Sequence, residues 1–163
     1  MATFVRLQTA PITRFDILAG KALACFAATS TLQVALVMIG VVGFGIRPSY
    51  PMLALACLSA SAGFVGLMMM VAGLGRTEQS ASGAGWAMLM PMTLFGGGMM
   101  PQFIMPAWMQ TVGHASPVKW AILAMEGAVW RRFSLTEMLL PCGILLAFGT
   151  VCFAIGVRAL RDT

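Results

Sequence analysis

The chain has 163 residues, of which 60% are hydrophobic and only 9% are charged, with a formal net charge of +5. Soluble domains carry about 25% charged residues, so this chain has too few polar side chains to cover a soluble globule. Its basic residues are scattered around apolar stretches and form no patch. This pattern disfavours nucleic acid as a partner and is typical of cations that flank membrane spans.

Four stretches of the chain hold no Asp, Glu, Lys or Arg: residues 22–46, 48–75, 79–118 and 138–157. About 20 apolar residues in a helix cross the roughly 30 Å of hydrocarbon in a bilayer, and each stretch is long enough. We therefore expect an all-α integral membrane protein with about four transmembrane helices, forming a single membrane domain over residues 1–163. The expected spans are residues 22–46, 52–75, 81–95 and 138–157.

The first 21 residues are polar and amphipathic, and they include the stretch "QTAPITRFDILAGK" at residues 8–21. Thr13 and Asp16 form a Ser/Thr-x-x-acid capping box, which predicts a helix that starts here and continues into the first span. Pro11 should break any preceding short helix. Two interpretations of Arg14 and Lys21 stand: they dock an acidic partner surface, or they are cations that reach the headgroups at an ordinary helix start.

The next two boundaries are the polar turns "RPSYP" (47–51) and "RTEQS" (76–80), which cannot continue a membrane helix. Between them, small residues recur four apart, as in the pairs Ser59/Gly63 and Ala62/Gly66. This spacing either allows close helix contact or marks a glycine-rich membrane helix with no special partner. The consecutive methionines at 68, 69 and 70 indicate adaptable packing or, alternatively, a plastic substrate path.

Residues 96–137 are predicted to form an external re-entrant helical hairpin. In "GGGMMPQFIMP" (96–106), three glycines and two prolines should end the third span. Short helices are expected at "PAWMQTVG" (106–113) and "SPVKWAILAMEGAVWRR" (116–132), the second about 15 residues long and too charged to cross a membrane alone. Glu126 should either pair with a cation such as Arg131 or lie at the interface as a plain glutamate.

Four spans place both termini on one side of the membrane. With the termini inside, six basic residues are cytoplasmic (Arg6, Arg14, Lys21, Arg76, Arg158, Arg161) and four are outside (Arg47, Lys119, Arg131, Arg132). This excess favours cytoplasmic termini in a multi-pass protein of the cell (inner or plasma) membrane. The aromatic residues Tyr50, Trp108, Trp120 and Trp130 then fall in the two outer loops, as expected for an interfacial belt.

The sequence contains no motif for chemistry of its own. It lacks a GxxxxGK[ST] phosphate loop, a GxGxxG fingerprint and an HExxH helix, and it has one histidine, His114. We therefore expect no enzymatic activity, cofactor or metal in this chain, and energy supplied by a gradient or by another subunit. The cysteines at 25, 57, 142 and 152 fall inside apolar spans and are interpreted as small apolar residues.

Three stretches, in order, resemble the C-terminal part of the permease subunit of type-2 ABC exporters, the ABC-2 family. "ATFVRLQTAPITRFDILAGK" is similar to the cytoplasmic coupling segment of that family, although Ala2 and Val5 stand where the family has Gly and Glu. "GLGRTEQSASGAG" is similar to the following cytoplasmic loop. "FGGGMMPQFIMPAWMQTVGHASPVKWAI" is similar to the external re-entrant region.

The resemblance implies a permease that forms a translocation path as a dimer, with ATP and Mg bound by a separate ATPase subunit. It implies coupling to that ATPase through Arg6, Pro11, Thr13, Arg14, Asp16, Gly20 and Lys21. It also implies a re-entrant region built on Gly98, Pro101, Pro106, Trp108, Pro117 and Glu126. The family has two further helices before the coupling segment, so we expect a fragment, a truncated frame or a split subunit. A non-transporting anchor, assembly factor or inactive remnant is the competing function, and no residue selects a substrate.

Overall fold

The computed structural model describes residues 14–75 and 77–161, and within these ranges every regular element is helical, with no β-strand. The predicted all-α class is therefore confirmed. The long helices are α2 (Arg14–Phe44), α3 (Tyr50–Leu74), α4 (Glu78–Gly96) and α7 (Leu135–Arg161). The shorter elements are η1, a 3₁₀ turn (Gln102–Ile104), α5 (Ala107–Gly113), α6 (Pro117–Glu126) and η2, a π-helical turn (Gly127–Arg131).

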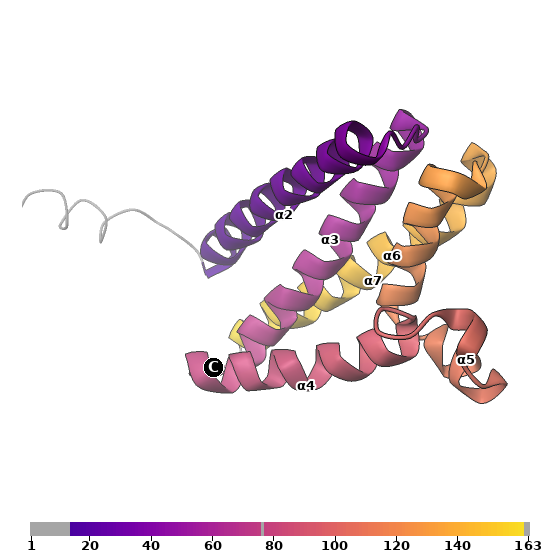
Figure 1. Cartoon of the computed structure of the whole chain (residues 1–163). Coiled ribbons are helices and arrows are strands. Elements are labelled where there is room, and N and C mark those ends of the chain that lie inside the picture. Colours follow the sequence, from indigo (N-terminus) through magenta and orange to yellow (C-terminus); the bar gives the residue numbers. More distant parts are fainter. Residues whose placement is uncertain (1–13, 76, 162–163) are drawn as a thin grey trace, which may run out of the picture.

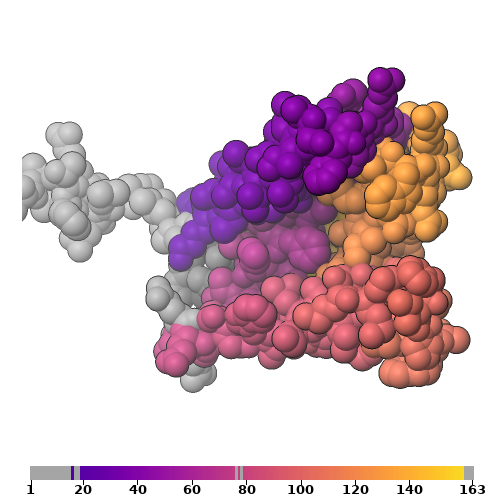
Figure 2. Space-filling model, viewed as in Figure 1, coloured from indigo at the N-terminus to yellow at the C-terminus, as the bar shows by residue number. Residues whose placement is uncertain are grey.

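The helices run between two ends of the molecule (Figure 1). The start of α2, the junction of α3 with α4 and the end of α7 lie together at one end, which we call the terminal end. The α2–α3 connection and all elements from η1 to η2 lie toward the opposite end, the loop end. In Figure 2, α3 is recessed between α2 above it and α4 below it. This arrangement is the up-and-down order expected of consecutive membrane-spanning helices.

Within the part of the chain that the structure describes, three helices are long and apolar enough to cross a membrane: residues 19–44, 50–74 and 135–159. They correspond to three of the four predicted spans, 22–46, 52–75 and 138–157, with ends that differ by one to three residues. The remaining predicted span, residues 81–95, lies within α4, which has only 19 residues and begins with Glu78, Gln79 and Ser80. Because these polar residues lower its mean hydropathy, α4 does not meet the same criterion, and the count of four spans rests on the sequence argument alone.

Glycines bring the backbones of α3 and α7 into direct contact. A Cβ atom added to Gly66 would collide with the carbonyl oxygen of Gly149. A Cβ added to Gly149 would lie 2.6 Å from the carbonyl oxygen of Ala62 and 2.8 Å from the Cα of Gly63. Gly73 and Gly156, seven residues further along each helix, make the same kind of close backbone contact. The small-residue spacing in α3 therefore marks a close helix contact, and the interpretation as a merely glycine-rich helix is wrong.

The three consecutive methionines of α3 divide between two environments. Met69 and Met70 are buried, at 4% and 8% exposure, and each packs in a hydrophobic cluster between α3 and α7. Met68 is 49% exposed and lines a groove between α3 and α4. All four cysteines carry free thiols. Cys152 of α7 is buried in the same cluster as Met70, and Cys142 of α7 is buried in a separate cluster with Leu53 and Ala56. The sulfur-containing side chains thus serve as core packing at these buried positions.

The predicted break after the third span is confirmed. Gly97 has φ 91°, a left-handed conformation that favours glycine, and its N–H donates to the carbonyl of Thr93 as a helix C-cap. The hydroxyl of Ser116 then donates to the carbonyl of Met92 over 2.7 Å, which fastens the start of α6 to the last turn of α4. Phe95 and Trp108 meet edge to face, with ring centroids 6.4 Å apart, and so hold α5 against the same turn.

The second predicted short helix differs from its expected form. Instead of one helix over residues 116–132, α6 ends at Glu126 and passes into the five-residue π-helical turn η2. Arg132 ends that turn at φ 50°, and the N–H of Phe133 returns to the carbonyl of Gly127. The ring of Phe133 lies where a Cβ at Gly127 would be, so the tight reversal into α7 depends on that glycine.

Candidate functional site

Of the residues predicted to couple to an ATPase, those that the structure describes lie at the terminal end. Arg6, Pro11 and Thr13 fall outside the described residues. The chain is helical from Arg14, which opens α2, and Asp16 lies exposed in the first turn, where a carboxylate favours the helix N-terminus. Gly20 and Lys21 follow, exposed on the same helix. Because Arg14 and Lys21 are seven residues apart, their positions share one face of α2. No break separates this first turn from the membrane-spanning part, which continues to Phe44.

The residues predicted for the re-entrant region all lie at the loop end, but most of them shape the backbone. Pro101 precedes η1, Pro106 precedes α5 and Pro117 opens α6. The N–H of Gly98 closes the end of α4 on the carbonyl of Thr93, and Trp108 is exposed on α5 apart from its contact with Phe95. Pro101 and Glu126 line the same cavity, of about 400 Å³, together with Gln102, Gln110 and Arg131.

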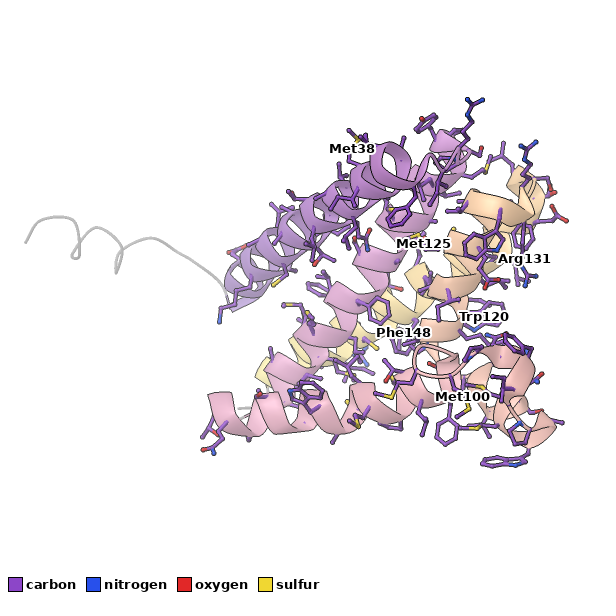
Figure 3. All side chains as sticks on the ribbon, in the orientation of Figure 1. Met38, Met100, Trp120, Met125, Arg131 and Phe148 are labelled. Atoms are coloured by element: carbon purple, nitrogen blue, oxygen red, sulfur yellow. The ribbon has the colours of Figure 1, made fainter. Side chains whose placement is uncertain are left out.

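Glu126 forms an ion pair at the loop end. Its Oε2 lies 2.9 Å from the Nε of Arg131, across the junction of α6 with the π-helical turn. The predicted pairing is confirmed, and the interpretation as a plain interfacial glutamate is not needed. Figure 3 shows Arg131 at the edge of the loop end. Because the two side chains carry opposite charges, the pair adds no net charge to the walls of the adjacent cavities.

His114, the one histidine of the sequence, joins α5 to α6. Its ring nitrogens lie 3.0 and 3.2 Å from the Nζ of Lys119, and its backbone carbonyl accepts from the indole N–H of Trp120 over 2.8 Å. The Nζ of Lys119 also donates to the carbonyl of Gln110 over 3.3 Å, and burial lowers the pKa of this amine. These contacts fasten the connection between α5 and α6 to the first turn of α6. Among the described residues, no three His, Cys, Asp or Glu side chains are grouped to hold a metal ion.

An apolar groove of about 670 Å³ runs between α3 and α4. Met68 of α3 and Trp86 of α4 both line it, together with Phe64, Leu67, Val71, Met88, Leu89, Met90 and Met99. Trp86 is 68% exposed and was not singled out from the sequence. The sequence did contain a signal that could have drawn attention to it, because Trp86 is the one Trp of the chain that does not fall in a predicted outer loop. Met68 and Met99 thus keep the second interpretation of the methionines, an adaptable path-lining surface, as a hypothesis.

A second, smaller cavity of about 330 Å³ lies where α2, α3 and α6 meet. It is lined by Gln33, Ala60, Phe64, Ala121, Ile122, Met125, Glu126, Val129 and Trp130. Met125 lies between α6 and α3 (Figure 3) and packs against the core cluster that includes Leu53 and Ala56 of α3. Gln33 was not considered from the sequence, although it is the one Gln within the first predicted span, and polar side chains at membrane depth are a recognised functional signal.

The comparisons with known proteins agree with this architecture. The profile of the family described as ABC-2 type transporter matches residues 1–130. The linearmycin resistance permease protein LnrN of Bacillus subtilis (strain 168) is 30% identical over 158 residues, which is 96% of this chain. The alignment covers 41% of the relative, so the chain spans well under half of that protein's length. No solved structure matches the chain significantly. With a profile match over most of its length and helices that can cross a membrane, this chain is a multi-pass membrane protein of the ABC-2 type transporter family.

Proposed function

We propose that the chain is the membrane-spanning subunit of an ATP-driven exporter, that two copies form the translocation path, and that a separate ATPase subunit binds and hydrolyses ATP with Mg. The observation that carries the proposal is the family match over residues 1–130, because it includes the N-terminal segment, three predicted spans and most of the loop end. The chain has no phosphate-binding loop of its own. Its contribution is therefore a path and a coupling surface, and catalysis belongs to the partner.

We place both termini in the cytoplasm and the loop end outside a cell membrane, with α4 as a fourth span. Three features support this arrangement. α4 runs from the terminal end to the loop end like the other long helices (Figure 1). Its 19 residues would extend about 28 Å, close to the hydrocarbon thickness. α5 and α6 have seven and ten residues, too few to cross, so the segment must return to the loop end as a re-entrant or interfacial hairpin.

The topology has a direct test. In a background without the four native cysteines, a cysteine at Thr77 should be labelled only by a membrane-permeant maleimide, because the terminal end faces the cytoplasm. A cysteine at Tyr50, at the loop end, should also react with an impermeant maleimide added to whole cells. Both positions are exposed, so access to the reagent decides the result. Labelling of Thr77→Cys by the impermeant reagent would reverse the orientation.

The function itself is tested with the complete transporter. The chain should co-purify with an ABC ATPase subunit, and proteoliposomes of the pair should accumulate substrate when ATP is supplied. Linearmycin is the first substrate to try, because the relative LnrN is named as a linearmycin resistance permease. The matched control carries a hydrolysis-deficient ATPase and should show binding without accumulation. Failure to associate with any ATPase would instead favour the non-transporting membrane module.

A further inference from the structure

Two membrane-spanning helices place polar side chains halfway along their length. Gln33 lies near the middle of the span at residues 19–44, and Ser61 near the middle of the span at residues 50–74. Ser61 is fully buried at 0% exposure. Polar groups at this depth are costly and usually face the protein interior or a water-filled cavity, where they mark a functional site. The pair therefore calls for a physical reason.

Helix packing accounts for only part of this cluster. The hydroxyl of Ser30 donates to that of Ser61 over 3.4 Å, and Ser61 donates to Oε1 of Gln33 over 3.3 Å, which links α2 to α3. The side-chain nitrogen Nε2 of Gln33 donates no hydrogen bond to any part of the chain that the structure describes. If the amide is turned around, so that its nitrogen lies near Ser61, then its oxygen is the atom without a hydrogen-bond partner. In either orientation, half of the amide is available to a ligand.

Gln33 is one of the residues that line the cavity between α2, α3 and α6. This cavity measures about 330 Å³, within the range of small-molecule sites. Its walls include the aromatic rings of Phe64 and Trp130 and the flexible side chain of Met125. Glu126 also lines it, but its carboxylate is already paired with Arg131 at 2.9 Å. A cationic ligand would have to compete with Arg131 for Glu126, so the cavity favours an uncharged occupant.

We propose that this cavity is a binding site for an uncharged amphiphile whose hydroxyl group bonds the amide of Gln33. A hydroxyl both donates and accepts, and so it suits either orientation of the amide. The apolar part of the ligand lies against Trp130 and Phe64. This inference rests on the proposed function and narrows it, because it assigns the exported substrate to a class and gives it a site in the membrane.

The test uses the purified complete transporter and a matched pair of probes, a dibrominated undecanol and the corresponding dibrominated undecane. Bromine quenches tryptophan fluorescence at contact distance, and the signal of Trp130 is the difference between the wild type and Trp130→Phe. The alcohol should quench Trp130 saturably. Gln33→Leu should raise its dissociation constant about tenfold, which is the scale of one lost buried hydrogen bond. The affinity of the alkane should change less than about twofold.

Two further variants control the experiment. Thr31→Val removes a hydroxyl that is exposed on α2 and bonded to the carbonyl of Ala27, and it should leave both affinities unchanged. Ala121→Phe places a ring in the cavity from α6 and should exclude both probes. Because Ala121→Phe acts on cavity volume, it keeps the proposal testable if Gln33→Leu fails to fold.

Several results would overturn the proposal. Wild-type affinity for the alcohol in Gln33→Leu, or quenching that does not depend on Trp130, would show that no such site exists. If Gln33→Leu instead changed subunit assembly on size exclusion and left the affinity unchanged, the amide would face a neighbouring copy. Association with the ATPase is scored separately. Its loss with intact quenching would reject the exporter function and retain the site.

Discussion

Replacing Gly149 by valine is expected to separate α7 from α3 and destabilise the protein, whereas the same change at Gly143 is expected to have little effect. A Cβ at Gly149 would lie 2.6 Å from the carbonyl oxygen of Ala62, well inside contact distance, and the obstacle is backbone that cannot rotate away. Gly143 lies on the same helix with no atom within 4 Å of the added Cβ. The two variants therefore share chemistry and helix propensity and differ only in contact.

The expected cost at Gly149 is about 3 kcal/mol, the upper end for overpacking of a closed interface. It should appear as a lower midpoint in SDS titration of the detergent-solubilised protein and as aggregation on size exclusion. Gly66→Val, which acts on the same contact from α3, should give the same loss. Combined with Gly149→Val it should cost less than the sum, because one separation of the helices relieves both collisions. Equal midpoints for Gly149→Val and Gly143→Val would contradict this account.

The helical class and most helix boundaries could be predicted from the sequence, because long stretches without charge separated by polar turns leave few alternatives. The break at Gly97 could also be predicted from the sequence, since consecutive glycines followed by Pro101 cannot continue a helix. The small-residue spacing around Gly63 and Gly66 allowed a close helix contact but did not distinguish it from a glycine-rich helix without a partner. The contact of Gly149 with these residues depends on the position of α7 along α3, and no local sequence pattern determines that position.

The cavities were harder to predict because each is assembled from several helices. Gln33 of α2 meets Ser61 of α3 and a wall of α6 only after the bundle has formed. That Trp86 lines a groove with Met68 follows only from the packing of α4 beside α3. The π-helical turn after Glu126 was also missed, because its sequence is compatible with an ordinary helix and the turn is imposed by Phe133 closing on Gly127. Local sequence predicted the helices, and the contacts between helices determined the candidate sites.

Breaking α2 at the membrane boundary should uncouple ATP hydrolysis from transport without releasing the ATPase. The helix runs unbroken for 31 residues from Arg14 to Phe44, a length of about 46 Å, while the hydrocarbon needs only about 20 residues. In the proposed topology, its first turns extend into the water as a continuation of the span. Ala19→Pro removes a backbone hydrogen bond and sets the proline ring against the preceding turn, a local cost of about 3 kcal/mol. The helix should bend there, and its membrane part should stay inserted.

Arg14→Glu should act on the same segment in a different way. If the partner surface is acidic, the variant places like charges against each other, and association should weaken about tenfold or more. Arg158→Glu is the matched control, because Arg158 is an exposed arginine at the terminal end of α7, outside the segment. Co-purification, ATP hydrolysis and ATP-driven accumulation should be measured on all three variants. Ala19→Pro should keep co-purification and hydrolysis but lose accumulation, and Arg14→Glu should lose co-purification first. Wild-type accumulation in both variants would show that the start of α2 neither binds the ATPase nor transmits its motion.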